Sequence, residues 1–135
     1  MPKSNGANGA ATDRMLRMMI VDDSNIIRRR IERSQQNARL QVVGSASNGR
    51  EAVELFQKTD PDVVTMDLTM PEMDGIQCVE QLVSLKPEIL ILVVSALADK
   101  ATAVEAIEKG ANGFLCKPFS DRQLNDALAE LLREV

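Results

Sequence analysis

The sequence predicts a single α/β domain in which a parallel sheet is covered by helices on both faces. Five short apolar runs alternate along the chain with five stretches of helical periodicity. The runs lack the apolar–polar alternation of a half-exposed strand, as expected when both faces of a parallel sheet are buried. At 135 residues the chain is long enough for one domain and too short for two ordinary ones. Together these observations indicate a doubly wound architecture.

The predicted strands are short segments rich in aliphatic and β-branched residues, bounded by turn formers or polar residues. Each is followed by a helical stretch, which is the order required to connect parallel strands. In chain order the strands are Met18–Val21, a β-branched run around Val42 and Val43, Val63–Met66, Ile89–Val94 and Gly113–Cys116.

The predicted helices carry apolar residues at spacings of three and four, and several begin with a capping residue. Ser24 is expected to cap the first helix, and Ser120 the last. The apolar faces are expected at Ile27 and Ile31, then Val53 and Phe56, then Ile76, Val79 and Val83, then Val104 and Ile107, and finally Leu124, Leu128, Leu131 and Leu132.

Composition excludes several classes of function. The net charge of −4 argues against a dedicated nucleic-acid-binding protein, and the absence of histidine excludes histidine catalysis and histidine metal ligation. No apolar run has the length of a membrane span, and the first residues lack the pattern of a secretory signal, so we expect a cytoplasmic protein that does not insert into membranes. Cys78 and Cys116 are expected to be small buried hydrophobes in a reducing compartment.

Residues 1–14 predict a flexible N-terminal tail, because they are rich in turn formers and show no apolar periodicity. Residues 15–135 are predicted to form the domain.

Polar side chains follow four of the predicted strands. Asp22 and Asp23 follow the first strand, Asp67 the third, Ser95 ends the fourth, and Lys117 follows the fifth. In a parallel sheet these carboxyl ends share one edge, where open α/β sheets bind their ligands. We therefore expect the five side chains to form one site.

The chemistry of such a site is that of phosphoryl transfer to an aspartate. Two unit charges about 4 Å apart repel by roughly 4 kcal/mol at an effective dielectric of 20, so three clustered carboxylates take up a proton or bind a cation. Mg²⁺ suits an all-oxygen set of ligands. Lys117 offers a point charge for a phosphoryl oxygen, and Ser95 offers a hydroxyl donor.

The chain resembles the receiver domains of bacterial response regulators, in particular the single-domain chemotaxis type, over about residues 17–133. The resemblance implies a flavodoxin-like (βα)5 fold with parallel strand order 2-1-3-4-5. The segments that carry it are Ile20–Ser24, Met66–Gly75, Val94–Ala96 and Lys117–Phe119.

The resemblance implies a role for each site residue. Asp67 is the expected phosphoacceptor, and Mg²⁺ is expected to be bound by Asp22, Asp23, Asp67 and the backbone carbonyl of Thr69. Lys117 is expected to bind the phosphoryl group.

The resemblance also implies a conformational response. Ser95 is expected to move toward the phosphoryl group, and Phe114 is the aromatic residue expected to follow it inward. The peptide bond between Lys117 and Pro118 is expected to be cis.

The predicted function is that of a stand-alone response regulator receiver that signals by phosphorylation-dependent protein contact. A histidine kinase or a phosphotransfer protein would donate the phosphoryl group, and an unknown output protein would read it, in chemotaxis or a related two-component pathway. Such a protein catalyses only its own phosphorylation and dephosphorylation, and we expect a monomer. The alternative within this class is a phosphate sink or a phosphorelay intermediate.

Three other classes compete with this interpretation. A phosphohydrolase commonly needs a second aspartate two residues after the nucleophile, where this chain has Thr69. A flavin- or nucleotide-binding module would need a glycine- or hydroxyl-rich phosphate loop in place of Asp22-Asp23-Ser24. A degenerate receiver would lack part of the residue set.

One further pattern has two interpretations. Four arginines on the first predicted helix form either a solvated face or a docking surface for an acidic partner. They are Arg28, Arg29, Arg30 and Arg33.

Overall fold

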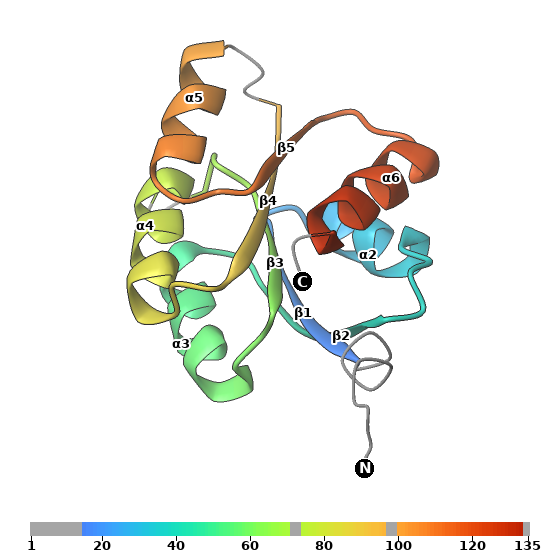
Figure 1. Cartoon of the computed structure of the whole chain (residues 1–135), viewed down its shortest axis with the longest axis horizontal. Coiled ribbons are helices and arrows are strands. Elements are labelled where there is room, and N and C mark those ends of the chain that lie inside the picture. Colours follow the sequence, from blue (N-terminus) through green and yellow to red (C-terminus); the bar gives the residue numbers. More distant parts are fainter. Residues whose placement is uncertain (1–14, 71–73, 97–99, 134–135) are drawn as a thin grey trace.

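The computed structural model describes residues 15–70, 74–96 and 100–133, and this part of the chain forms one five-stranded parallel sheet with helices on both faces (Figure 1). The strand order is β2-β1-β3-β4-β5, which confirms the predicted doubly wound topology. The predicted tail, residues 1–14, lies outside the described residues. The elements are β1 (Leu16–Val21), α2 (Asn25–Ser34), β2 (Leu40–Ala46), α3 (Gly49–Thr59), β3 (Val63–Met66), α4 (Gly75–Leu85), β4 (Leu90–Ser95), α5 (Lys100–Glu108), β5 (Gly113–Cys116) and α6 (Asp121–Leu132).

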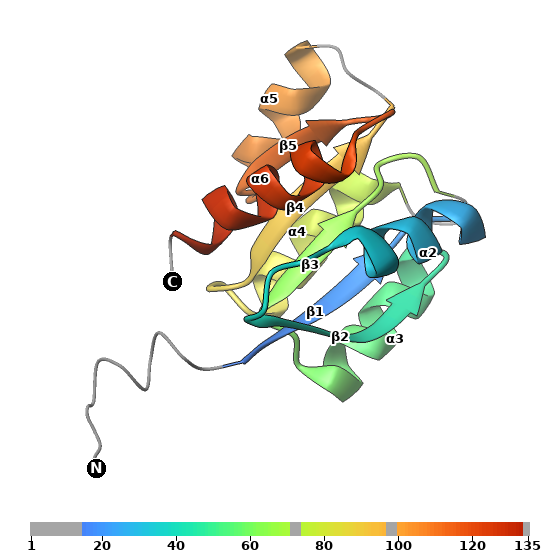
Figure 2. The same ribbon diagram turned by 90° about the vertical axis from the view of Figure 1, so that its right-hand side faces the viewer.

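The helices divide into two layers around the sheet. Figure 1 shows α3, α4 and α5 on one face and α2 and α6 on the other, and Figure 2 turns the α2–α6 face toward the viewer. None of the helices formed by the described residues is long and apolar enough to cross a membrane.

Successive residues of the central strands point into opposite layers, so the domain has two hydrophobic cores. In β1, Met19 and Val21 join the core beneath α3, α4 and α5, whereas Met18 and Ile20 join the core beneath α2 and α6. All four are essentially inaccessible to solvent. This two-sided burial explains why the strand sequences are apolar without alternation.

Polar residues start four of the helices directly after the loops at the carboxyl edge of the sheet. Each cap accepts a hydrogen bond from the backbone N–H three residues later. In α6 the Gln123 side chain also accepts from the Ser120 backbone N–H, which completes a capping box. Because the caps fix where these helices begin, they also limit the freedom of the loops that carry the polar residues. The caps are Ser24, Asn48, Asp74 and Ser120.

The predicted apolar face of α5 is wrong. Val104 and Ile107 are 46% and 47% exposed, and the buried residue of this helix is Ala106. Ala106 packs into the core beneath α3, α4 and α5, and the larger aliphatic residues of the helix lie toward solvent.

The two cysteines have different environments, so the expectation that both are buried is half wrong. Cys78 on α4 is buried, and burial raises the pKa of its thiol to about 12. Cys116 is exposed, because it is the last residue of the edge strand β5 and has no strand on its outer side.

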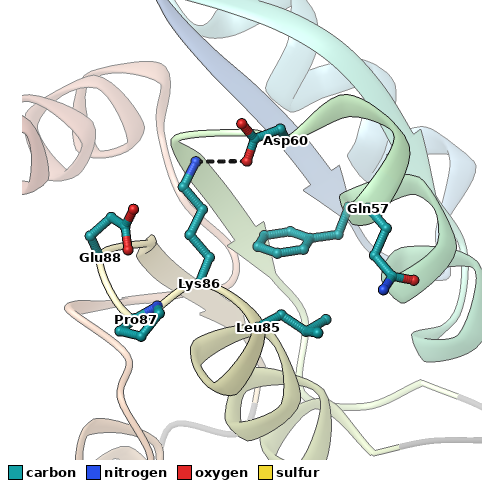
Figure 3. Close-up of a pocket in the computed structure, with 7 residues that line it drawn as sticks. Gln57, Asp60, Leu85, Lys86, Pro87 and Glu88 are labelled. Atoms are coloured by element: carbon teal, nitrogen blue, oxygen red, sulfur yellow. Dashed lines mark hydrogen bonds and ion pairs between the residues drawn. The ribbon is translucent and has the colours of Figure 1, made fainter.

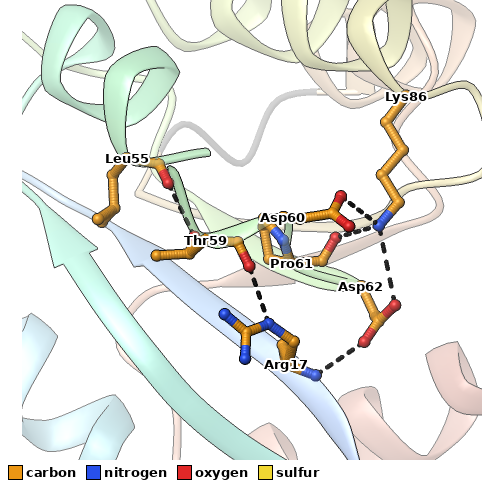
Figure 4. A network of polar contacts seen from close by, with 7 residues as sticks. All are labelled: Arg17, Leu55, Thr59, Asp60, Pro61, Asp62 and Lys86. Atoms are coloured by element: carbon orange, nitrogen blue, oxygen red, sulfur yellow. Dashed lines mark hydrogen bonds and ion pairs between the residues drawn. The ribbon is translucent and has the colours of Figure 1, made fainter. Parts of the chain in front are cut away.

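A polar network joins the chain segments at the opposite, amino edge of the sheet (Figure 4). The Arg17 side chain donates to the carbonyl of Thr59 at 2.8 Å, and its backbone N–H donates to Asp62 at 2.9 Å. Lys86, which caps the end of α4, donates to the carbonyl of Pro61 at 2.7 Å. These bonds connect the ends of α3 and α4 to the start of β3.

A surface pocket of about 590 Å³ lies beside this network, between the C-terminal ends of α3 and α4 (Figure 3). It lies at the amino edge of the sheet, away from the strand ends that carry the acidic residues. Its lining residues are Phe56, Gln57, Asp60, Leu85, Lys86, Pro87 and Glu88.

Candidate functional site

The backbone ladder places two aspartates at the carboxyl edge of the sheet. The Asp22 N–H donates to the carbonyl of Ala46 at 3.1 Å, and the Asp67 N–H donates to the carbonyl of Val21 at 2.9 Å. Both residues therefore continue the strand geometry by one residue beyond β1 and β3. Each is only 1% exposed.

Asp22 and Asp67 form an acidic cluster with Asp23. One carboxylate oxygen from each of the three lies within 4.8 Å of the others. Asp23 is exposed, whereas the other two are buried. The cluster is therefore open to solvent on the Asp23 side and enclosed by protein on the other.

Lys117 lies against the enclosed side of the cluster. Its ammonium nitrogen is 2.7 Å from Oδ2 of Asp22 and 3.6 Å from Oδ2 of Asp67. Its side chain is only 18% exposed. One positive charge is therefore shared by two buried carboxylates, which leaves the site net negative.

The environment of Asp67 has opposing effects on its pKa. Burial raises the pKa above its ordinary value, and the nearby negative charge of Asp22 raises it further. Hydrogen bonds from Thr69 and the charge of Lys117 act in the other direction but do not cancel the rise. Oδ1 of Asp67 accepts from both the backbone N–H and the hydroxyl of Thr69, at 3.2 Å each.

The other predicted site residues lie on β4, on β5 and in the loop after β3. Ser95 is fully buried at the end of β4, where its carbonyl accepts from the Lys117 N–H at 2.9 Å. Phe114 on β5 is partly buried and packs against the core beneath α3, α4 and α5. Thr69 is exposed in the loop between β3 and α4. The bond between Lys117 and Pro118 is cis, as predicted.

The three carboxylates fit a divalent cation. Oδ1 of Asp22 accepts from the Ser24 N–H at 2.9 Å, but no hydrogen bond of standard geometry reaches its buried Oδ2. Within the described part of the chain that oxygen has only the ammonium contact with Lys117, so it retains capacity for a ligand. An all-oxygen set with an open side is the environment that Mg²⁺ prefers.

Two arginines near the site were not identified individually from the sequence. Arg28 Nη1 donates to the backbone carbonyl of Asp22 at 2.6 Å, and Arg30 Nη2 donates to the backbone carbonyl of Phe119. The Arg30 guanidinium also lies over the Phe119 ring, 4.6 Å from its centroid. No local pattern predicts the Arg30 contact, because it spans 89 residues of sequence.

Comparison with known proteins gives a consistent result. The family described as the response regulator receiver domain matches residues 18–129. The chain is 42% identical over 112 residues to the chemotaxis protein CheY of Thermotoga maritima, covering 83% of this chain and 93% of that protein. It is 39% identical over 114 residues to the chemotaxis protein CheY of Listeria monocytogenes, covering 84% and 96%.

Solved structures show the same relationship. The response regulator domain of Thermotoga maritima CheB superposes with a TM-score of 0.77 at 34% identity, over 90% of this chain and 96% of that one. CheY in the CheX–CheY–BeF3–Mg²⁺ complex of Borrelia burgdorferi superposes with a TM-score of 0.85 at 26% identity, over 90% and 92%.

The family match covers both the fold and the loops that carry the acidic cluster and Lys117. The chain therefore belongs to the response regulator receiver domains, signalling proteins that accept a phosphoryl group in two-component pathways and are not classical enzymes.

Proposed function

We propose that Asp67 is the phosphoacceptor of this receiver and that Mg²⁺ supports the transfer. The observation that carries the proposal is the contact of Lys117 with both Asp22 and Asp67 inside a cluster of three carboxylates. Asp67 follows β3, the middle strand of the sheet, whereas Asp22 and Asp23 follow β1 and Lys117 follows the edge strand β5.

Mg²⁺ would be held by Asp22, Asp23, Asp67 and the backbone carbonyl of Thr69. When bound, the cation would neutralise charge on the phosphoryl oxygens. A carboxylate oxygen of Asp67 attacks phosphorus as the bond between phosphorus and the donor's imidazole nitrogen breaks, and that nitrogen leaves with the electron pair. Lys117 balances the negative charge that gathers on the phosphoryl oxygens. In dephosphorylation a water oxygen attacks phosphorus, and the Asp67 carboxylate leaves with the electron pair of the bond that breaks, which gives inorganic phosphate and the free carboxylate. The chain therefore catalyses only its own phosphorylation and dephosphorylation.

The phosphoryl group changes the charge at the carboxyl edge, and Ser95 and Phe114 transmit the change to the face formed by α5, β5 and α6. A histidine kinase or a phosphotransfer protein supplies the phosphoryl group, and an output protein reads the altered face. Chemotaxis is the pathway favoured by the relatives named CheY. The Borrelia structure shows CheY in complex with another protein. We further propose a cytoplasmic monomer whose receiver domain begins at residue 15 after a tail.

Labelling with acetyl phosphate, a small acyl-phosphate donor, tests the acceptor. Intact-mass spectrometry should show that the wild-type chain gains one phosphoryl group in the presence of Mg²⁺ and none in the presence of excess chelator. Asp67→Asn should gain none under either condition, because an amide does not act as the nucleophile.

Asp126→Asn is the control, because it removes an exposed carboxylate on the surface of α6 whose ion-pair partner is Arg122, one turn earlier. It should be labelled at the wild-type rate. Equal labelling of Asp67→Asn and wild type would remove Asp67 as the acceptor.

A further inference from the structure

We propose that Arg28 and Arg30 of α2 are positioning residues, which hold the two loops that carry Asp22 and Lys117. The inference rests on the proposed role of these loops in phosphoryl transfer. It gives Arg28 and Arg30 contacts within the domain, whereas a solvated face or a docking surface would leave their guanidinium groups free of such contacts.

The four arginines of α2 divide into two kinds. Arg29 and Arg33 are exposed, and the side chain of neither forms a hydrogen bond or an ion pair with another residue in the described part of the chain. Arg28 and Arg30 are partly buried, and the guanidinium of each donates to a backbone carbonyl outside the helix. A guanidinium that is fixed on a carbonyl loses side-chain freedom, so these contacts restrain the loops they reach.

Arg30 restrains the loop between β5 and α6. Its Nη2 donates to the carbonyl of Phe119, its guanidinium lies over the Phe119 ring, and Asp121 Oδ1 is 3.7 Å from Nη2. Phe119 is only 3% exposed and stands two residues after Lys117. The three contacts therefore fix the short segment from which the Lys117 ammonium reaches the carboxylates.

Arg28 restrains the loop between β1 and α2. Its Nη1 donates to the carbonyl of Asp22 at 2.6 Å, and its Nη2 is held by the side chain of Asn25 at 3.3 Å. The Asp22 N–H and Oδ1 are already held by Ala46 and Ser24. The bond from Arg28 occupies the carbonyl, so the backbone N–H, the backbone carbonyl and one carboxylate oxygen of Asp22 are all hydrogen-bonded.

The two contacts make α2 a common support for both sides of the site. The pairing of α2 with α6 is continued farther along the helix, where Asn125 donates to the carbonyl of Ser34 at 2.9 Å and accepts from the Gln36 N–H at 2.7 Å. Figure 2 shows the two helices on one face of the sheet. Because Arg30 supports the lysine loop and Arg28 the metal-ligand loop, their loss should have different kinetic signatures.

The experiment compares matched methionine variants, which keep an unbranched side chain but remove the donors. Arg30→Met should lower the rate of acetyl phosphate labelling at saturating Mg²⁺ by about tenfold, because misplacing a catalytic group has large kinetic consequences. The Mg²⁺ concentration at half-maximal rate should stay within about twofold, because the three carboxylates are untouched. Arg30→Lys should recover most of the rate, because an ammonium can also donate to the Phe119 carbonyl and contact its ring.

Arg28→Met should show the opposite pattern, with a Mg²⁺ half-saturation raised about tenfold, as for residues that orient metal ligands. Arg29→Met and Arg33→Met lose the same charge from the same helix and should match wild type in both measurements. General loss of folding in a variant would lower its maximal labelling rate and raise its Mg²⁺ half-saturation together. The proposal is overturned if Arg30→Met labels as fast as Arg33→Met, or if Arg28→Met and Arg30→Met show the same pattern of losses.

Hydrogen exchange followed by mass spectrometry gives a readout that needs no phosphorylation. Arg30→Met should exchange faster than Arg33→Met over residues 116–120, and equal exchange there would also overturn the proposal. A wild-type chain that takes no label would instead contradict the proposed function, and the exchange result would still decide whether Arg30 restrains the loop. Faster exchange with an unchanged labelling rate would make Arg30 a structural residue only, against the proposal.

Discussion

At the scale of single residues, the phosphoryl site depends on close backbone packing as well as on charge. Gly75 begins α4, and its N–H donates to the carbonyl of Leu68 at 3.0 Å, which closes the loop after Asp67. A Cβ built on Gly75 would lie 2.4 Å from the carbonyl oxygen of Asp67 and 2.4 Å from Cα of Leu68. Backbone atoms cannot move aside as a flexible side chain can, so this position requires glycine for steric reasons.

Gly75→Ala is therefore expected to displace the loop that carries Asp67 and Thr69. Gly75 is the first residue of α4, so the preference for alanine in a helix interior does not offset the clash, and overpacking against backbone costs about 1–3 kcal/mol. We expect the free energy of unfolding to fall by about 2 kcal/mol in urea denaturation, with slower acetyl phosphate labelling.

Gly113→Ala provides the comparison, because its Cβ would meet side chains and no backbone: Cδ1 of Leu92 at 3.2 Å and Cδ1 of Leu131 at 4.0 Å. It should cost less than about 1 kcal/mol. A Gly75→Ala protein as stable and as readily labelled as Gly113→Ala would contradict the steric argument.

At the scale of helices and strands, the two helices beside β5 differ in which residues they bury. The large apolar residues are the buried ones on α6, but not on α5. On α6 the predicted leucines are all buried, with Leu124 and Leu128 fully inaccessible. On α5 the large aliphatic residues Val104 and Ile107 are half exposed, and Ala106 makes the packing contact. Apolar periodicity therefore identified the buried face of α6 and misidentified that of α5.

Truncation of one residue from each helix should show this difference. Leu128→Ala should lower the free energy of unfolding by about 3 kcal/mol, since it removes a fully buried side chain and leaves a cavity. Ile107→Ala should change it by less than about 1 kcal/mol, since half of that side chain already contacts water. Urea denaturation of both variants measures the difference, and equal losses would mean that Ile107 is packed as deeply as Leu128.

At the scale of the whole molecule, the parallel sheet concentrates negative charge at one edge, and this affects folding stability. The pKa of Asp67 is raised in the folded protein by burial and by Asp22. A carboxyl group with a raised pKa binds its proton more tightly in the folded state. It therefore favours folding at pH values below its unfolded pKa, and this contribution is lost as the pH rises through its folded pKa.

Asp67→Asn should consequently be more stable than wild type at pH 7 without divalent cations. Repulsion between close carboxylates, reduced by Lys117, predicts a gain of about 1–3 kcal/mol in the free energy of unfolding. The gain should vanish below about pH 4, where Asp67 is protonated in both states of the wild-type protein.

Urea denaturation across this pH range, with chelator present, measures the gain. Asp126→Asn should change the stability by less than about 0.5 kcal/mol throughout, because its carboxylate is exposed on α6. A difference between Asp67→Asn and wild type that did not depend on pH would show that the carboxylate charge is not its source.

The fold class, the order of elements and several helix starts of this protein follow from its amino-acid sequence alone. These features depend on neighbouring residues: apolar runs such as Val63–Met66, caps such as Ser24 and Ser120, and the spacing of the α6 leucines. The convergence of Asp22, Asp67 and Lys117 was predictable as well, because parallel strands must place their carboxyl ends at one edge.

The contacts that hold the loops carrying these groups depend on tertiary packing. The contact of Arg30 with Phe119, the steric requirement at Gly75 and the outward rotation of Val104 and Ile107 each depend on segments distant in sequence. Periodicity records which residues share a face of one element. It holds no information on which neighbour covers that face, or on how closely two backbones approach, and these are set by packing among all the elements at once.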